Sequence, residues 1–400
     1  MKYRELGNTG LKVSEIGFGG EWITGKDRAA DMALVEHCRQ AGINILDCWM
    51  ADPAVRSSLG AGLAGHREEW IVQGHVGSTW QDGHYVRTRD VAAVKPAFED
   101  LLERLGTDYI DLGMIHYVDD MEDWEACTAP DSPFLAYVRQ LKEAGTIRHI
   151  GLSSHSPEVA LTAAKSGLVE VIMFSINPAF DMLPATADLD AAFTDATYDG
   201  DAKLAGIDPV RAELYRTCEM LGVGLTVMKP FAGGRLLDAA RSPFKVALTP
   251  SQCIHYCLTH PAVASVMCGC ATPAEVDAAL AYETAKEKER DYASVLAKAP
   301  RHTYRGQCTY CGHCKPCPFD IDIAMVNKFY DLALMAVEAA GNPKKRAERR
   351  AAVPAGVAGH YADLRTHAGD CIGCGACLRR CPFGVDVPER MMLARELFGE

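Results

Sequence analysis

The sequence predicts an α/β chain in which a parallel (β/α)8 barrel is followed by a small α-helical module that carries cysteine clusters. Three observations lead to this fold class. Short apolar runs alternate with amphipathic segments over residues 14–282. There are eight such runs, the number that a closed parallel barrel needs. Towards the C-terminus this alternation gives way to two tight groups of cysteines.

The eight predicted strands are short and rich in valine and isoleucine, without polar–apolar alternation. Strands of that kind are covered on both faces, as in parallel sheets. They are residues 15–20, 43–47, 70–74, 109–116, 149–155, 169–177, 223–229 and 263–269. Amphipathic helices are predicted between them, for example over 90–105, 134–144 and 157–166. A doubly wound open sheet is the alternative, but no glycine-rich dinucleotide fingerprint follows the first strand.

Three segments fall outside the strand–helix repeat. Residues 2–13 predict a short hairpin before the first barrel strand. Residues 78–90 predict a long loop over the barrel mouth, where aromatic side chains such as Tyr85 could cover a substrate or cofactor ring. A polar insert over about 181–208 has little periodicity, and in a barrel it would lie on the C-terminal face, where substrates bind. A flexible loop is the alternative interpretation of this insert.

The domain boundaries follow from the change in pattern. The barrel is expected to span residues 1–285. The charged segment after Tyr282 predicts a helical linker over 286–305, and the cysteine-rich module is expected to span 306–400.

The composition of the 400-residue chain narrows the classes of partner. A net charge of −12 argues against general binding to nucleic acid or anionic lipid, which requires clustered positive charge. No apolar stretch of about 18 residues is present, so no membrane span is expected, and the N-terminus lacks the apolar core of a signal peptide. We therefore expect a cytoplasmic protein. The sequence leaves open whether the chain forms a homo-oligomer. In a reducing compartment the sixteen cysteines are not expected to form disulfides.

Eight cysteines fall into two motifs that are typical of iron–sulfur proteins. The first is CTYCGHCKPCP and the second is CIGCGACLRRCP. The second matches the C-x2-C-x2-C-x3-C-P run of two-cluster ferredoxins, and the first is one residue shorter before its last cysteine. In such runs the first three thiolates hold one cluster and the fourth holds the other. We therefore expect two 4Fe–4S clusters, one held by Cys308, Cys311, Cys314 and Cys381, the other by Cys371, Cys374, Cys377 and Cys317.

A pair of zinc sites is the alternative interpretation of these cysteines. Structural zinc usually takes its thiolates from two well-separated C-x2-C pairs, which is unlike two runs that each end in Cys-Pro. The long segment between Cys317 and Cys371 has a helical pattern. It therefore predicts an α-helical ferredoxin-like module instead of the compact β-rich type.

Several barrel motifs resemble the aldo-keto reductase family. Residues 47–60, DCWMADPAVRSSLG, align with the family motif D-T-A-x-x-Y-G-x-S-E-x-x-L-G, with the aspartate kept as Asp47. The tyrosine position holds Asp52 and the glutamate position holds Arg56. Further likeness runs through GTIRHIGLSSHSPE, VMKPFAGGRLL and SVMCGCATPAEV. The likeness covers about residues 1–285 and is strongest to the iron–sulfur subgroup, whose members end in the same double-cysteine module.

The resemblance implies an active site at the C-terminal mouth of the barrel. The family's lysine position holds His75, and its histidine is kept as His116. Because the tyrosine and lysine are both replaced, we expect proton transfer by His75 or His116, with Asp47 orienting the imidazole and Asp52 as a second carboxylate. A divalent metal held by these four side chains is an alternative, and so is a disused site.

The resemblance also implies NAD(H) or NADP(H) as a cofactor. The family's nicotinamide contacts correspond to Met228 and to Ser154 or its neighbour. The start of a helix at Thr272, after Gly269, could receive a pyrophosphate on its free backbone amides. No Arg or Lys lies in this stretch, so NADH is expected to bind at least as well as NADPH. A flavin could also mediate, although no motif requires one.

Together these features predict an oxygen-sensitive iron–sulfur oxidoreductase. Its substrate is expected to be a small organic molecule at the barrel mouth, with electrons passing through two 4Fe–4S clusters, and its electron partner to be of the ferredoxin or flavodoxin type. Two alternatives stay open. One is an NAD(P)H-dependent carbonyl reductase with structural or regulatory clusters, and the other is a non-catalytic electron-transfer subunit.

Overall fold

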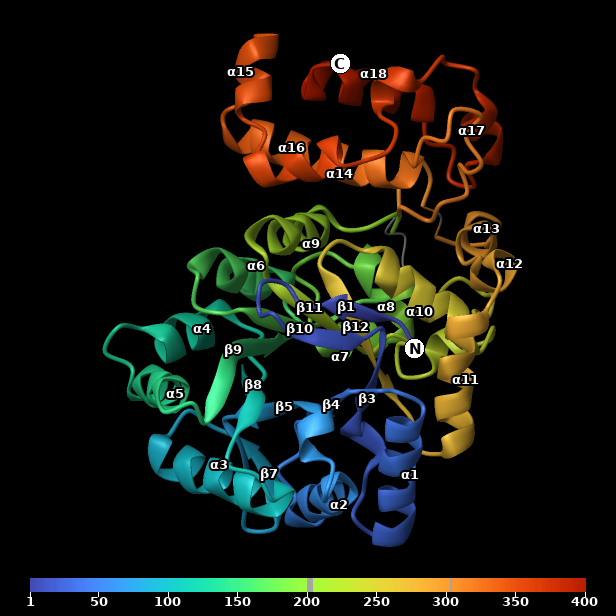
Figure 1. Ribbon diagram of the computed structural model, residues 1–400. Helices are drawn as coiled ribbons and strands as arrows, with labels where there is room; N and C mark the ends of the chain where they lie inside the picture. Colours follow the sequence, from blue (N-terminus) through green and yellow to red (C-terminus); the bar gives the residue numbers. More distant parts are fainter. Residues whose placement is uncertain (200–203, 303) are drawn as a thin grey trace.

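The computed structural model describes residues 1–199, 204–302 and 304–400. Its core is a closed barrel of eight parallel strands, with the order β10-β11-β12-β3-β4-β5-β8-β9. The barrel strands are β3 (Ile16–Gly19), β4 (Ile45–Cys48), β5 (Ile71–Val76), β8 (Ile110–Ile115), β9 (Ile147–Ser154), β10 (Val171–Ser175), β11 (Gly224–Met228) and β12 (Val263–Gly269). The predicted eight-stranded barrel is therefore confirmed (Figure 1). Each strand overlaps a predicted run, and β4, β5 and β9 extend one or two residues beyond theirs.

Helices cover the outside of the barrel. Most begin with a side-chain cap and many with a proline in the first turn, which suits a chain that leaves a strand and turns back along the sheet. They are α1 (Arg28–Gln40), α2 (Pro53–Leu63), α3 (Val91–Leu105), α4 (Met121–Thr128), α5 (Pro133–Glu143), α6 (Pro157–Ser166), α9 (Pro209–Leu221), α10 (Pro250–Thr259) and α11 (Pro273–Thr284). The helices predicted over 90–105, 134–144 and 157–166 are confirmed as α3, α5 and α6.

Two hairpins extend the barrel. Strands β1 (Tyr3–Glu5) and β2 (Lys12–Ser14) form the predicted N-terminal hairpin. Strands β6 (Ser78–Gln81) and β7 (His84–Arg87) form a second one. The expectation of a long loop over 78–90 is therefore wrong. Asp82 and Gly83 both have positive φ angles, 50° and 81°, and such residues form the tight turn that joins two paired strands.

The insert over 181–208 contains two short helices, α7 (Leu189–Phe193) and α8 (Asp195–Asp199), and its residues 200–203 lie outside the described part. The linker contains α12 (Glu287–Arg290) and α13 (Ala293–Ala297). It is anchored by the buried Tyr304, whose hydroxyl donates to the carbonyl oxygen of Pro178 at 2.5 Å.

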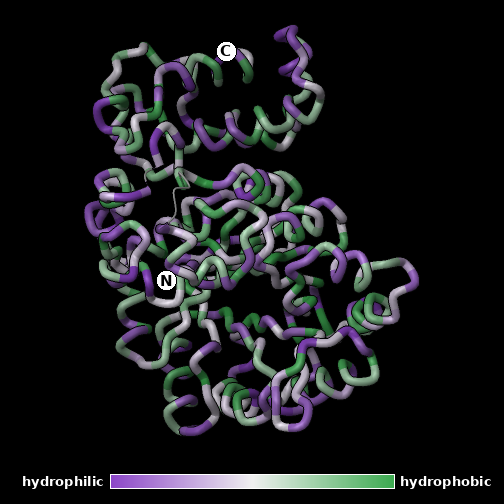
Figure 2. Tube along the Cα trace, turned by 180° about the vertical axis from the view of Figure 1, so that it is seen from behind, coloured by the Kyte–Doolittle hydropathy of each residue, from purple (hydrophilic) through white to green (hydrophobic). Residues whose placement is uncertain are grey.

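The C-terminal module is helical and lies beside the barrel, against α9 (Figure 1). Its helices are α14 (Ile323–Ala339), α15 (Arg346–Ala351), α16 (Ala355–Ala362), α17 (Ala376–Arg380) and α18 (Val387–Phe398). The basic helix α15 is at the outer edge and is strongly hydrophilic (Figure 2). Among the described residues, no helix is both long enough and apolar enough to cross a membrane.

Candidate active site

Three predicted site residues meet at the carboxyl ends of neighbouring strands. Asp47 is on β4, His75 is on β5, and His116 directly follows β8; these strands are paired side by side. His75 Nε2 lies 2.9 Å from Asp47 Oδ1, and His75 Nδ1 lies 2.7 Å from His116 Nδ1. Gln73 Nε2 also donates to Asp47 Oδ1, at 3.1 Å. The structure thus joins Asp47, His75 and His116 into one hydrogen-bonded line.

A phenol extends this line. The hydroxyl of Tyr85, on β7, lies 2.6 Å from His116 Nε2. Trp49 packs against both rings, edge-on to Tyr85 at 5.6 Å and stacked on His116 at 6.2 Å between centroids. Sequence reasoning placed Tyr85 at the barrel mouth but missed its bond to His116. The sequence signal for this hairpin was an Asp-Gly dipeptide flanked on each side by β-branched and aromatic residues.

The line is largely closed to water. Asp47, His75 and His116 are 1%, 2% and 4% exposed, whereas Tyr85 is partly exposed. Burial, then the nearby His75, holds the pKa of His116 well below its usual range. His116 is therefore a neutral imidazole near pH 7, with one nitrogen that donates and one that accepts a hydrogen bond.

Asp52 lies apart from this line. Its side chain accepts from the amide of Ala54, at 2.8 Å, and caps the N-terminus of α2. Arg56, one turn later, is 2% exposed and pairs with Asp100 at 3.0 Å. Arg56 also donates to the carbonyl oxygen of Ser78 at 3.3 Å, so it holds the start of the β6–β7 hairpin.

The residues predicted to contact a nicotinamide cofactor surround the other side of the mouth. Ser154, Met228 and Gly269 end β9, β11 and β12, and Thr272 caps α11 in a capping box with Glu275. Glu275 Oε2 accepts from the amides of Ala271 and Thr272, at 2.6 and 3.2 Å. A pyrophosphate at this helix start would therefore compete with a carboxylate of the protein for those amides.

His155, next to Ser154, is a second imidazole at the mouth with a carboxylate partner. Its Nδ1 lies 2.9 Å from Asp119 Oδ2. Its Nε2 is buried and has no hydrogen-bond partner among the described residues. Burial lowers the pKa of His155, so it is a neutral ring with a free nitrogen.

The described residues of the barrel do not form a ligand set for a divalent metal. Across the described ranges, no three His, Cys, Asp or Glu side chains are placed together around one point where a single ion could sit. A 4Fe–4S cluster has different needs, since each of its four thiolates binds a separate iron and stands at a separate corner of the cube.

The cysteines of the module fit that second arrangement. One cavity is lined by Cys317 together with Cys371, Cys374 and Cys377. These four come from both ends of the module, in the combination that the motif predicts for one cluster. None of the sixteen cysteines is in a disulfide.

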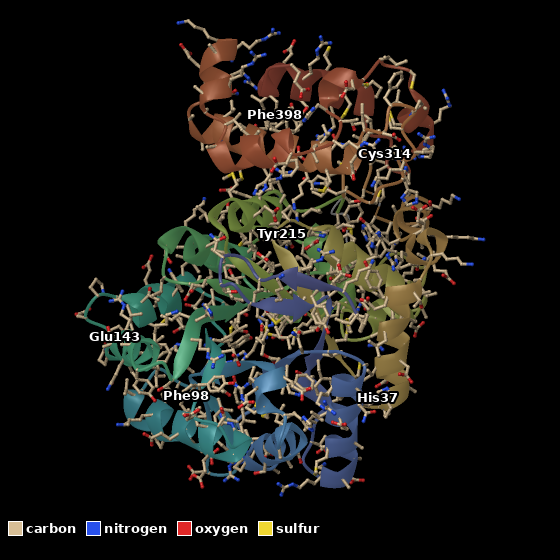
Figure 3. All side chains as sticks on the ribbon, in the orientation of Figure 1. His37, Phe98, Glu143, Tyr215, Cys314 and Phe398 are labelled. Atoms are coloured by element: carbon tan, nitrogen blue, oxygen red, sulfur yellow. The ribbon has the colours of Figure 1, made fainter. Side chains whose placement is uncertain are left out.

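Cys314 lies near two other cysteines of the first predicted cluster, Cys311 and Cys381. Burial raises the pKa of its thiol to about 12, and the neighbouring Cys311, Cys381 and Cys377 contribute to this rise. A group of soft thiols that share a sparsely solvated space is the donor set that iron–sulfur clusters use. Cys314 lies in the module, and Tyr215 lies in the part of the barrel that adjoins it (Figure 3).

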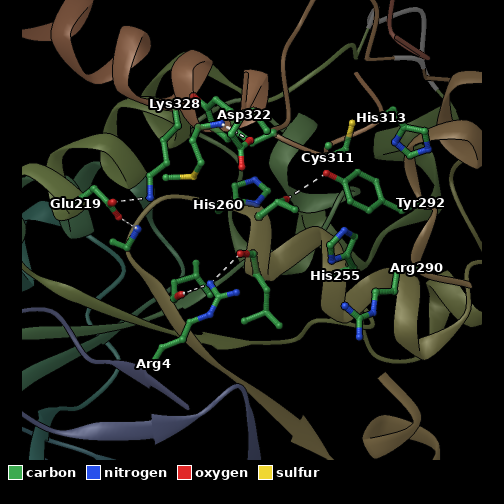
Figure 4. Close-up of a pocket in the computed structure, with 18 of the residues that line it drawn as sticks. Arg4, Glu219, His255, His260, Arg290, Tyr292, Cys311, His313, Asp322 and Lys328 are labelled. Atoms are coloured by element: carbon green, nitrogen blue, oxygen red, sulfur yellow. Dashed lines mark hydrogen bonds and ion pairs between the residues drawn. The ribbon is translucent and has the colours of Figure 1, made fainter. Parts of the chain in front are cut away.

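A large cavity of about 1220 Å³ lies away from the mouth, between the barrel and the module (Figure 4). Its lining includes Arg4 from the N-terminal hairpin, Glu219 from the end of α9, and Cys311 from the module. Its basic groups are largely engaged by the protein, since Arg4 donates to Glu15 and Lys328 pairs with Glu219. We place the chemistry at the mouth because the linked buried polar groups are there.

Comparisons with known proteins agree with this architecture. Residues 15–251 match the aldo/keto reductase family, and residues 305–385 match the 4Fe-4S dicluster domain. An uncharacterized oxidoreductase of Bacillus subtilis (strain 168), YqkF, is 31% identical over 192 residues, which cover 46% of this chain and 58% of that protein. The L-galactose dehydrogenase of Arabidopsis thaliana is 28% identical over 206 residues, 46% of this chain and 61% of the plant enzyme. The chain thus spans about three fifths of the length of these curated relatives.

Among solved structures, the holo form of the aldo-keto reductase AKR11C1 from Bacillus halodurans superposes with a TM-score of 0.57 at 24% identity. The superposition covers 76% of this chain and 98% of that one. At this identity the likeness shows the barrel fold alone. With its family match over more than half of the residues, the chain belongs to the aldo/keto reductase family and ends in a 4Fe–4S dicluster domain.

Proposed function

We propose that this protein is an oxidoreductase that interconverts a carbonyl and an alcohol on a small organic substrate at the barrel mouth, with electrons passing through two 4Fe–4S clusters. The observation that carries the proposal is the buried Asp47–His75–His116 line at the ends of three adjacent strands. Buried, linked titratable groups at the C-terminal face of such a barrel are typical of catalytic sites.

The cluster ligands are assigned by motif and by position. Cys308, Cys311, Cys314 and Cys381 hold one cluster, and Cys371, Cys374, Cys377 and Cys317 hold the other. The cavity lined by the second set supports this assignment, and Cys311 and Cys381 of the first set are both near Cys314. When bound, the clusters supply one-electron transfer.

The barrel residues have separate roles in the proposal. His75 and His116 move the proton that accompanies reduction or oxidation, and Asp47 orients His75 and stabilises the ring when it is protonated. The unpartnered Nε2 of His155 is available to a donor group of the substrate. The capping contact of Asp52 assigns it to the stability of α2, outside the proton line.

A nicotinamide-dependent carbonyl reductase is the second candidate. It is favoured by the family match and by the position of Ser154, Met228, Gly269 and Thr272 around the mouth. The two candidates differ in their electron donor, so they can be separated by the donor that supports turnover.

The first test compares electron donors for the anaerobically purified, full-length protein. A panel of small aldehydes and ketones is offered with dithionite-reduced methyl viologen, with NADH or with NADPH. Turnover with the viologen alone supports the cluster route, and turnover with NADH or NADPH alone supports the second candidate. A protein that keeps both clusters and reduces no carbonyl with any donor contradicts both.

The second test removes a proton-handling group. We expect His116→Ala to lower kcat by about 10²- to 10⁴-fold, the usual contribution of general acid–base catalysis. His37→Ala removes a partly exposed histidine that pairs with Asp277 on the outside of the barrel, and should leave kcat unchanged. Equal activity of the two variants, with iron content intact, would show that the barrel line is not catalytic.

A further inference from the structure

We propose that Tyr85, and neither histidine, is the group that exchanges the proton with the substrate. This inference rests on the proposed function and deepens it. The hydroxyl of Tyr85 lies 2.6 Å from His116 Nε2, and the line continues through His75 to Asp47 at 2.7 and 2.9 Å. The four groups form one continuous relay of carboxylate, imidazole, imidazole and phenol.

Exposure decides which member of the relay meets the substrate. Asp47, His75 and His116 are almost completely buried, and both nitrogens of each ring are engaged within the line. Tyr85 is the member of the relay that is partly exposed. Of the four groups, Tyr85 is therefore the one that a molecule at the mouth can meet, whereas His116 is covered and both of its ring nitrogens are engaged.

Hydrogen-bond polarity gives the relay two states. With neutral rings, His75 Nε2 donates to the Asp47 carboxylate, so His75 Nδ1 must accept from His116 Nδ1. His116 Nε2 then accepts from Tyr85, and the phenol oxygen turns its lone pairs outward. With one extra proton, carried by His75 beside Asp47, the other two bonds reverse: His75 Nδ1 donates to His116 Nδ1, and His116 Nε2 donates to Tyr85, whose phenol proton points outward. His116 stays a neutral ring, and the His75–Asp47 bond keeps its direction.

The proton step balances within these groups. In the reducing direction by the cluster route, the carbonyl takes two electrons, delivered one at a time by the reduced clusters, and two protons. One proton, from water at the mouth, forms the C–H bond, and the relay supplies the other to the negatively charged substrate oxygen. The Tyr85 O–H bond breaks as the substrate O–H bond forms; the phenol oxygen takes a proton from His116 Nε2, and His116 Nδ1 takes one from His75 Nδ1. The substrate leaves as an alcohol and the relay becomes neutral. Oxidation runs through the same bonds in reverse.

The β6–β7 hairpin is the element that brings Tyr85 to this place. Its start is held by Arg56, which donates to the carbonyl oxygen of Ser78, and by the Ser78 hydroxyl, which donates to the carbonyl oxygen of Trp49 at 2.6 Å. Two of the positions where the chain departs from the family pattern thus act together: Arg56 anchors the hairpin, and His75, through His116, connects its tyrosine to Asp47.

The charge environment suits a phenol that stays protonated between turnovers. Burial raises the pKa of Tyr85, while Arg87 and Arg89 oppose the rise. The titratable and charged groups that face the Tyr85–His116 pair are His75, Asp47, Arg87, Arg89, Tyr117 and His155.

The test is Tyr85→Phe, which keeps the ring against Trp49 and removes the hydroxyl. We expect kcat to fall about 10²- to 10³-fold, with KM changed less than about threefold, because the lost interaction acts in the transition state. The control is His84→Ala, an exposed neighbour in the same hairpin, which should keep full activity. A second readout is the ring-nitrogen NMR shifts of His116 in histidine-labelled protein, which should move in Tyr85→Phe and stay unchanged in His84→Ala.

The outcomes separate this inference from the proposed function. If His116→Ala abolishes turnover and Tyr85→Phe does not, the proposed function stands and the role of Tyr85 is overturned. If the wild-type protein reduces no carbonyl, the proposed function fails, and the NMR shifts still decide whether the phenol belongs to the relay. Unchanged His116 shifts in Tyr85→Phe overturn the inference by themselves.

Discussion

His255, on α10, is a half-buried imidazole outside the active site whose protonation affects stability. Burial, followed by the charges of Arg290, Arg4 and His313, lowers its pKa from 6.5 to about 4. Below pH 6.5 the unfolded chain binds a proton at this position and the folded chain does not. The free energy of unfolding must therefore decrease as the pH falls from 6.5 towards 4, by roughly 3 kcal/mol over the full range.

This residue gives a stability prediction that does not depend on the chemistry of the barrel. We expect wild-type protein to lose about 2 kcal/mol more of its unfolding free energy between pH 7 and pH 4.5 than His255→Gln does. Urea unfolding followed by circular dichroism at the two pH values measures the difference. Equal losses in both proteins would show that His255 titrates normally in the folded state.

At the level of single residues, the sequence predicted part of the candidate site. Asp47, His75 and His116 could be grouped because each ends a predicted strand, and parallel strands end at one face. Asp52 was grouped with them too, but its side chain caps α2, because a carboxylate before a proline is as well suited to cap a helix as to serve a site. The bond of Tyr85 to His116 depends on hairpin register, which residue spacing does not give.

Helix α2 provides a test at the scale of an element. Asp52 accepts from the amide of Ala54 at its N-terminus, so Asp52→Ala should cost about 1 kcal/mol of stability, while Asp52→Asn should retain most of the cap. We expect both variants to keep kcat within about threefold of wild type, because Asp52 is outside the proton line. A large loss of kcat in Asp52→Asn, with stability intact, would instead return Asp52 to the active site.

The elements of the barrel were the most predictable part of the fold. Runs such as 109–116 are apolar on both faces, and only strands covered on both sides have that pattern. The hairpin β6–β7 was harder, since its short strands mix polar and aromatic residues. Its turn depends on the positive φ angles of Asp82 and Gly83. The short helices α7 and α8 have too few turns to show a helical period.

At the scale of the whole molecule, the module contacts the barrel through polar and aromatic pairs. Lys328, on α14, pairs with Glu219 at 2.5 Å. The hydroxyl of Tyr292, in the linker, donates to Thr309 Oγ1 at 3.0 Å and lies 3.1 Å from Thr259 Oγ1 of α10, so the linker joins the two parts. Thr309 lies between two proposed cluster ligands, so the linker contacts the module next to the proposed site of the first cluster.

In the proposed assignment, each motif gives three cysteines to one cluster and its fourth cysteine to the other. This assignment makes a prediction about the whole module. Cys317→Ala and Cys374→Ala should each lower the iron content from about eight to about four per chain, and the double variant should keep about four, since both residues serve one cluster. Cys317→Ala combined with Cys311→Ala should lose nearly all iron. Cys268→Ala, a buried cysteine of β12, is the control and should keep about eight irons.

A different pairing would reverse the pattern of the double variants. If Cys317 served the same cluster as Cys311, the Cys317/Cys311 pair would keep about four irons, and the Cys317/Cys374 pair would lose nearly all of them.

The central claim is that two electron-carrying clusters are joined to a proton-handling site in one chain. Its most direct test is the iron, zinc and acid-labile sulfide content of the full-length protein purified without oxygen, together with its electron paramagnetic resonance spectrum after reduction. The account predicts about eight irons and eight sulfides per chain and the signals of reduced 4Fe–4S clusters. A colourless protein that contains zinc and no sulfide would contradict it.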